Sequence, residues 1–321
     1  MKFARRALLG AMLAALATPT LAADDWPNKP VRVIVPSSPG GGTDIYARLL
    51  TQQLGNLLGQ TFVVDNRPGA SGIIGADAVA RSAPDGYTIL VASNSSITIS
   101  PGLYTNLPFD AAKDFTAIAR GVMAPMVLAV NSNEPYQTLD QLLAAGKAKP
   151  DELFYGSAGV ASAPYLGVRM LDEITGTKFN HVPYKGVGPG IQDLLAGRIQ
   201  FMMPDVAAVR GFLADGRLRA LAVNQRTDVL PNVKTFEELG VKGMDAVVSF
   251  SVLGPANLPA PIVEKLSKAV NDAMRDPETA KRLNELVLVP VFDTPAEFSQ
   301  SLNQEREMWA AFIKRNNITP D

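Results

Sequence analysis

Short runs of β-branched and apolar residues alternate with helical patterns along most of the chain. The run at 31–35 is typical of a strand, and apolar residues then recur at helical spacing from Ile45 to Leu58, where Gly59 ends the pattern. This alternation predicts α/β layers with mainly parallel sheets, in two similar blocks. Strands are expected at residues 31–35, 61–64, 87–92, 115–119, 126–130, 153–156, 179–182, 200–203, 219–223 and 247–253.

Helix starts are marked by capping residues. Thr294 and Glu297 form a capping box ahead of a helix expected at 295–316, and Ser71 is expected to cap a helix that runs to about Ala83.

In parallel α/β sheets, ligands bind in loops at the carboxyl ends of the strands. A chain of two such blocks therefore has its expected pocket between them.

The first residues have the pattern of an export signal. Lys2, Arg5 and Arg6 precede an apolar run at 7–17, and small residues follow up to Ala23. The run is shorter than the roughly 20 residues that span a bilayer, which disfavours the alternative of a membrane anchor. A signal peptide at 1–22, or 1–23, is predicted, and with it export to a bacterial periplasm.

Composition excludes several classes of site. The chain has no cysteine and a single histidine, so thiol nucleophiles, disulfides and sites with Cys ligands or two His ligands are excluded. The balance of 30 basic and 31 acidic residues argues against a nucleic-acid partner. No phosphate loop, zinc-protease motif, nucleophile elbow or dinucleotide fingerprint is present, and we interpret His181 as a structural or rim residue. Neither a metal, a cofactor nor catalysis is expected.

Two glycine-rich loops are the informative features. Loop one (residues 36–44) and loop two (residues 156–162) each follow a strand and precede a helix. Uncovered backbone N–H groups and the partial positive charge of a helix start suit an anion such as a carboxylate. Each loop alone is equally compatible with a plain strand-to-helix turn. Their corresponding places in the two blocks favour a cleft with paired anion-binding walls.

The chain from Trp26 onward resembles the Bug family of periplasmic solute receptors, which are related to the tripartite tricarboxylate transporters. The most specific stretches are DNRPGASGIIGA at 65–76, APDGYTIL at 83–90 and HVPYKG at 181–186. Others, in the same order as in the family, are WPNKPVRVIVP at 26–36, PGGGTD at 39–44, LPFDAAKDF at 107–115, YGSAG at 155–159, GRLRALAV at 216–223 and LPNVKTFEELG at 230–240.

The resemblance implies a two-lobed periplasmic binding protein of a type II-like fold. Each lobe is a mixed sheet flanked by helices, and two crossing strands near 124–130 and 249–254 form a hinge. The implied boundaries are lobe 1 at 23–124 and 254–321, and lobe 2 at 125–253. Such a protein closes on its ligand and performs no catalysis.

The resemblance also implies how the ligand is held, by main-chain groups, hydroxyls and bridging water around one carboxylate. Asp44 is interpreted as a helix-start residue that orients loop one. Ser37 and Ser249 stand where members often have aromatic residues. The resemblance therefore implies the class of ligand, a carboxylate, but not which carboxylate. The implied ligand-binding residues are Gly41, Gly42, Thr43, Asp44, Ser93, Ser95, Ser157, Gly159, Ser162, Tyr184, Lys185 and Asp205.

The leading hypothesis is therefore a monomeric periplasmic receptor that delivers a small carboxylate to inner-membrane permease subunits. A second hypothesis keeps the same site but makes the partner a sensor kinase. An exported enzyme on the same fold, and a structural role without a ligand, are the remaining alternatives.

Overall fold

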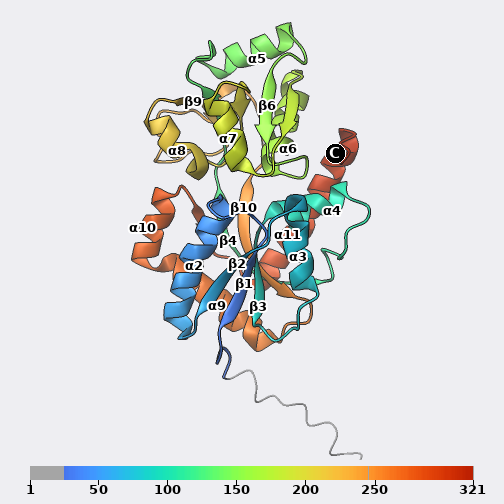
Figure 1. Ribbon diagram of the computed structural model, residues 1–321, viewed down its shortest axis with the longest axis vertical. Helices are drawn as coiled ribbons and strands as arrows, with labels where there is room; N and C mark the ends of the chain where they lie inside the picture. The colour runs from blue at the N-terminus through green and yellow to red at the C-terminus, as the bar shows by residue number, and fades with distance from the viewer. Residues whose placement is uncertain (1–24, 245, 321) are drawn as a thin grey trace, which may run out of the picture.

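The computed structural model describes residues 25–244 and 246–320; the predicted signal peptide lies outside these residues. The chain forms two α/β lobes, one above the other in Figure 1. The first lobe, at the bottom of the figure, is built on a six-stranded sheet and the second on a five-stranded sheet. Among the described helices, none is both long enough and apolar enough to cross a membrane.

The first lobe combines a parallel and an antiparallel half-sheet. Its strand order is β11-β4-β10-β3-β1-β2, in which β2, β1 and β3 run parallel and β10, β4 and β11 pair antiparallel. The strands are β1 (Val31–Val35), β2 (Phe62–Asn66), β3 (Thr88–Ser93), β4 (Phe115–Ala124), β10 (Val248–Pro255) and β11 (Val289–Val291).

Helices cover both faces of this sheet, as the strand sequence requires. Alternate residues of a strand point to opposite faces. Val33 and Val35 accordingly share a core with Tyr46 of α2, whereas Ile34 packs in a separate cluster with Val79 of α3. The helices of this lobe are α2 (Gly42–Leu58), α3 (Ile73–Ala80), α4 (Ser100–Leu103), α9 (Ala260–Arg275), α10 (Pro277–Glu285) and α11 (Pro295–Arg315), with a short 3-10 turn at Ala70–Gly72 and a π-turn at Ser95–Ile99.

The second lobe has the strand order β7-β6-β8-β5-β9. Strands β7, β6 and β8 pair parallel, and β5 pairs antiparallel with both of its neighbours, β8 and β9. The strands are β5 (Val127–Asn131), β6 (Phe154–Ser157), β7 (Asn180–Pro183), β8 (Phe201–Met202) and β9 (Leu218–Val223). The helices are α5 (Leu139–Ala148), α6 (Ala163–Thr175), α7 (Val187–Leu195) and α8 (Val206–Ala214), and a 3-10 turn follows at Glu237–Leu239.

The chain passes between the sheets twice. The first passage lies between β4, which ends at Ala124, and β5, which begins at Val127. The second was expected at 249–254, and that prediction is wrong. All of β10 pairs with β3 or β4 in the first lobe, so the passage and the boundary expected at residue 253 move to before Val248.

Asn224 ties the two passages together. Its Oδ1 accepts a hydrogen bond from the backbone N–H of Met126 (2.7 Å), and its Nδ2 donates to the carbonyl of Ala246 (2.9 Å). One side chain therefore holds both connecting segments in register, at the place where a two-lobed protein bends.

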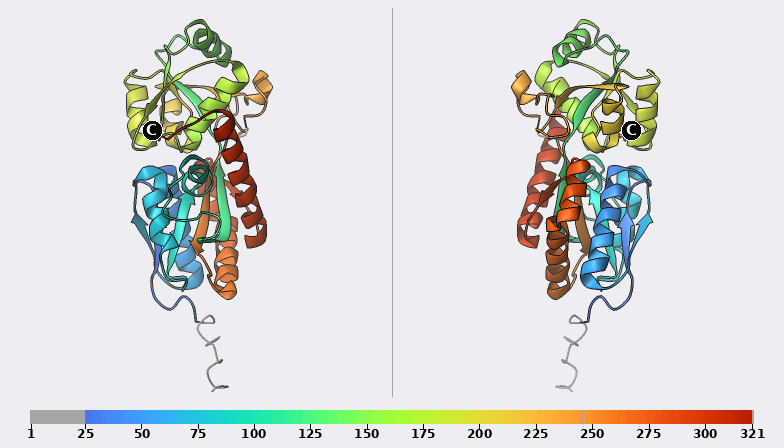
Figure 2. Two further views of the ribbon diagram at one scale, coloured as in Figure 1. Left: turned by 90° about the vertical axis from the view of Figure 1, so that its right-hand side faces the viewer. Right: turned by 90° about the vertical axis from the view of Figure 1, so that its left-hand side faces the viewer.

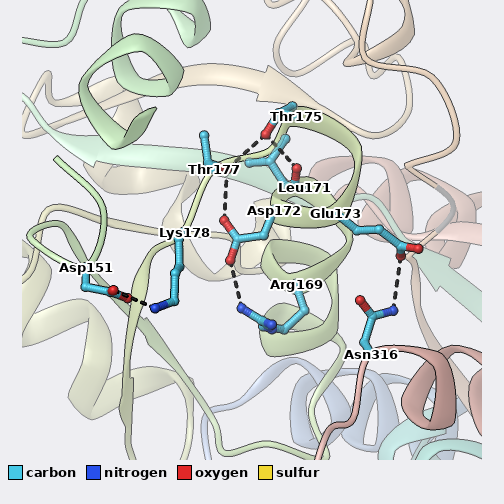
Figure 3. A network of polar contacts seen from close by, with 9 residues as sticks. All are labelled: Asp151, Arg169, Leu171, Asp172, Glu173, Thr175, Thr177, Lys178 and Asn316. Carbon is cyan, nitrogen blue, oxygen red and sulfur yellow. Dashed lines mark hydrogen bonds and ion pairs between the residues drawn. The ribbon is translucent and has the colours of Figure 1, made fainter. Parts of the chain in front are cut away.

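A second contact between the lobes lies at the end of α11, which runs along the side of the first lobe toward the second (Figure 2). Arg315 Nε lies 2.8 Å from Glu173 Oε1 on α6, and Asn316 Nδ2 donates to Glu173 Oε2 (3.1 Å). Figure 3 shows Glu173 beside Asp172, which accepts hydrogen bonds from Arg169 and Thr177.

Candidate functional site

The carboxyl ends of the parallel strands in the two lobes face one another. A Cβ placed on Gly42, at the start of α2, would lie 3.5 Å from Oδ2 of Asp205 in the second lobe. A Cβ placed on Gly159 in loop two would lie 3.8 Å from the hydroxyl of Ser71 in the first lobe. Both glycine-rich loops therefore meet the opposite lobe, as expected for the loops of an interlobe site.

Loop one presents a helix start without a side-chain cap. Gly41 is the N-cap of α2 in extended conformation, and no side chain of a described residue caps this helix start. The first N–H groups of a helix have no partner within the helix and carry its partial positive charge. Thr43 is buried, yet its hydroxyl makes no hydrogen bond to any described residue. The start of α2 thus offers donors for an anion.

Asp44 holds the conformation of loop one through hydrogen bonds of its buried carboxylate. Its Oδ2 accepts hydrogen bonds from the N–H of Gly40 and from Arg48 Nε (both 2.9 Å), and its Oδ1 accepts one from Asn66 Nδ2 (2.9 Å). Burial raises the pKa of this carboxyl, but the bonds from Arg48, Gly40 and Asn66 outweigh burial and bring the pKa below its ordinary value. This geometry supports the interpretation that Asp44 orients the loop.

Loop two is organised differently, because its hydroxyls are already engaged. Ser162 caps α6: its Oγ accepts a hydrogen bond from the N–H of Tyr165 (3.4 Å) and donates to the carbonyl of Gly159 (2.6 Å). Ser157 ends β6, and its Oγ accepts a hydrogen bond from the N–H of Gly159 (3.1 Å) and lies 2.7 Å from Nε2 of His181. These bonds close loop two on itself.

The Ser157–His181 contact has the spacing of a nucleophile and its base. The sequence offers no reason to pair these residues, which lie on the neighbouring strands β6 and β7. Ser157 has no exposed surface, and its hydroxyl is shared with the backbone of Gly159. His181 packs against the rings of Tyr155 and Tyr165, with ring centroids 5.1 and 4.6 Å apart. We therefore interpret the pair as part of the support of loop two.

Asp205 lies between the lobes at the start of α8. Its Oδ1 accepts a hydrogen bond from the N–H of Ala208 (2.9 Å), the usual role of an N-cap aspartate. The residue is only 6% exposed, and its Oδ2 is the atom that faces Gly42. Burial raises the pKa of this carboxyl above its ordinary value.

The remaining predicted residues fall into two groups. Ser93 is the last residue of β3, opposite Phe250, and Ser95 begins the π-turn that follows. Because β3 runs parallel to β1, both residues lie at the edge of the sheet where loop one begins. The Tyr184 hydroxyl instead donates to Asp193 of α7 (2.9 Å), and burial raises its pKa to about 12. Lys185 is exposed in the following turn. The Tyr184 ring lies beside loop two, where a Cβ placed on Gly156 would come within 3.0 Å of its Cε2.

Sequence reasoning missed the role of the turn after β2. Ser71 was expected to cap a helix, but Gly72 is the N-cap of α3, and that prediction is wrong. Gly69, Ala70, Ser71 and Gly72 all have positive φ, which is costly for the two residues with side chains. The turn presents Ser71 to loop two. The NRPGA stretch at 66–70 was the available signal, since consecutive turn residues there mark an unusual backbone.

Phe250 was also missed. A Cβ on Gly42 would come within 2.8 Å of its Cζ, and its ring stacks on that of Tyr46 at a centroid distance of 6.1 Å. Only the pairing of β10 with β3 and β4 brings this residue beneath loop one.

Two α/β lobes that face each other with strand ends and helix starts define a two-lobed solute-binding protein. Comparison with known proteins agrees. The family profile described as "Tripartite tricarboxylate transporter family receptor" matches residues 46–318. Protein BugT of Bordetella pertussis is 34% identical over 304 residues, covering 94% of this chain and 93% of that protein.

Solved structures extend the likeness to the whole fold. Rpa4515 of R. palustris with adipate superposes with a TM-score of 0.88 at 31% identity, covering 92% of this chain and all of that one. MatC of Rhodopseudomonas palustris with bound malate gives a TM-score of 0.84 at 29% identity, with 90% and 100% coverage. The chain belongs to the tripartite tricarboxylate transporter receptor family, which includes Bug proteins; its members are solute-binding receptors and not enzymes.

Proposed function

We propose that this protein is a periplasmic receptor that captures a small organic acid between its lobes and delivers it to a tripartite tricarboxylate-type permease. The observation that carries the proposal is the uncapped start of α2, which faces Asp205 of the second lobe. Beside it is the buried hydroxyl of Thr43, which has no hydrogen-bond partner in the part of the chain that the structure describes. These neutral donors suit a carboxylate without adding a formal charge.

Capture is proposed to work by closure. A carboxylate bound at loop one completes its contacts only when loop two and the start of α8 approach from the second lobe. The ligand thereby shifts the population toward the closed arrangement. Bending is assigned to the two passages near Ala124–Val127 and before Val248, which Asn224 joins.

The ligand class is drawn from the site and from relatives. Adipate and malate, bound to the two relatives above, are both dicarboxylates. We propose a small dicarboxylate, one end of which lies at loop one. The other end meets walls that differ from those of many members at Ser37 and Ser249, so the chain length of the acid is left to experiment.

A thermal-shift screen of the mature protein against mono-, di- and tricarboxylates and amino acids tests the proposal. Ligand at about 100 times its dissociation constant stabilises the folded state by about 2.7 kcal/mol, which raises the melting temperature of a protein of this size by several degrees. A shift confined to one carboxylate series supports the proposal. No shift with any acid, together with no bound acid in mass spectra of the denatured protein, contradicts it.

Delivery is tested separately. Cells that carry a matching permease should take up the labelled acid only when the receptor is present. Uptake that does not depend on the permease, or a receptor that instead changes the activity of a sensor kinase, would contradict the proposed partner.

A further inference from the structure

Asp205 places a buried carboxylate at the proposed carboxylate site. One of its oxygens caps α8, and the other faces the start of α2. No side chain among the described residues donates a hydrogen bond to Asp205, and no ion pair joins it to a cation there. A ligand carboxylate on the N–H groups of α2 would therefore come close to a second acidic group.

The surroundings of Asp205 offer little compensation. The chain passage beside it, at Pro125–Val127, carries no titratable group, and neither do β8 and β10. The titratable residues of α2 are Asp44, Tyr46 and Arg48. Asp44 and Arg48 pair with each other, and the ring of Tyr46 packs on Phe250. In α8 the one titratable residue is Arg210, five positions after Asp205.

Two carboxylates that share a water-poor site cannot both remain ionised at ordinary cost. The usual solution is one proton held between them in a short, charge-assisted hydrogen bond. The α2 start, which attracts negative charge, then stabilises the single charge that is left.

Resting on the proposed function, we infer that the receptor captures its organic acid together with one proton, held between Asp205 Oδ2 and the bound carboxylate. The proton comes from solvent and returns to it on release, so no bond other than the O–H bond forms or breaks. Asp205 is thus a specificity-determining residue: it discriminates against a fully ionised carboxylate and favours one that arrives when a proton is available.

The direction of the pH dependence follows from the sign of the linkage. Burial already raises the pKa of Asp205 in the free protein, and a bound carboxylate raises it further. Between these two pKa values, binding takes up a proton, so affinity falls by up to about tenfold for each pH unit of increase. Above the higher pKa the affinity is low and constant.

Titration calorimetry with adipate and with malate tests the inference. Runs at about pH 6.5 and about pH 8, where these acids are ionised, use two buffers of different ionisation enthalpy at each pH, which gives the number of protons taken up. The wild type should take up a large fraction of one proton at the lower pH and bind at least about tenfold more tightly there. An unchanged affinity with no proton uptake would overturn the inference.

Asp205→Asn sharpens the test. The amide keeps an oxygen for the N–H of Ala208 and presents an N–H₂ donor toward the ligand. Its binding should take up no proton, should not change between the two pH values, and at the higher pH should be tighter than that of the wild type. Proton uptake by D205N equal to that of the wild type would contradict the inference, because the proton would then belong to another group.

Asp276→Asn is the matched control. Asp276 also caps a helix, through the N–H of Thr279 (2.9 Å), but that helix is α10, which follows neither loop one nor loop two. D276N should keep the proton uptake of the wild type. Binding without proton uptake overturns this inference alone, whereas no binding of any carboxylate to the wild type at either pH overturns the proposed function as well.

Discussion

Loop one and loop two look alike in sequence but are held in opposite ways. The helix after loop one begins at a glycine with no side-chain cap, and the hydroxyl of Thr43 has no hydrogen-bond partner among the described residues. The helix after loop two is capped by Ser162, and the hydroxyl of Ser157 is bonded within the loop and to His181. Loop one is fixed from beneath by Asp44, while loop two is fixed by its own hydroxyls.

This difference assigns different tasks to two similar signals. Donors that are already bonded lose a partner when they turn to a ligand, so they add little affinity. Unbonded donors at a helix start gain a partner. We therefore expect loop one to supply most of the binding energy, and loop two to supply a rigid surface that closes over it.

Removing the support of loop one should have the largest effect. Asp44→Ala deletes a buried acceptor of three hydrogen bonds and leaves Gly40, Arg48 and Asn66 without it. We expect urea denaturation to show a loss of about 3 kcal/mol in the free energy of unfolding, and calorimetry to show a loss of affinity of about 100-fold or more. Asp77→Ala, which removes a surface pair with Arg81, is the control and should cost less than about 1 kcal/mol. Equal effects of the two variants would contradict the account.

A methyl group at the start of α2 should be nearly as harmful to binding, with a smaller cost to folding. In Gly42→Ala the new Cβ would approach Phe250 Cζ to 2.8 Å, so the ring must move, and it would place a methyl group in contact with Asp205 Oδ2 (3.5 Å) between the lobes. We expect an affinity loss of about 30-fold, or about 2 kcal/mol. Gly55→Ala lies in the same helix and meets only a carbonyl at 3.4 Å; it should bind normally and be slightly more stable. Normal binding by G42A would show that the ligand does not lie at this helix start.

The far end of α6, the helix after loop two, should show a stability effect without a binding effect. Burial raises the pKa of Asp172 to about 6, although Thr177 and Arg169 oppose the shift. A raised carboxyl pKa gives stability that is complete below the ordinary pKa and is lost as pH rises through the raised value. Relative to the wild type, Asp172→Asn should therefore gain about 2 kcal/mol of unfolding free energy between about pH 4 and about pH 7.5, measured by urea denaturation. The same pH dependence in both proteins would contradict this assignment.

Local sequence patterns predicted most of the helices and strands. They could not predict features that depend on pairing between distant parts of the chain. The capping box of Thr294 and Glu297 is confirmed, because its partners lie three residues apart. The sheet that receives β10 depends on β3 and β4, more than 120 residues earlier, and the run of apolar residues at 247–253 carries no information about it. The crossing was misplaced for that reason.

The site shows the same limit. Glycines between a strand and a helix predicted both loops, and Gly40 and Gly159 do adopt the positive φ that favours glycine. Part of what engages the hydroxyl of Ser157 is His181, 24 residues later in the chain, whereas the hydroxyl of Thr43 meets no hydrogen-bond partner among the described residues. The left-handed turn at Ser71 and the position of Phe250 are likewise set by contacts that no local pattern contains.

The most direct test of the account is a paired titration of Thr43→Ala and Ser157→Ala with the carboxylate that the screen identifies, with urea denaturation of both variants and Thr43→Ser as the control. We predict that T43A binds about tenfold more weakly with unchanged stability, that T43S binds as the wild type does, and that S157A loses about 1–2 kcal/mol of stability while its affinity changes less than about threefold. Weak binding by S157A together with normal binding by T43A would contradict the central claim that loop one holds the ligand and loop two holds its shape.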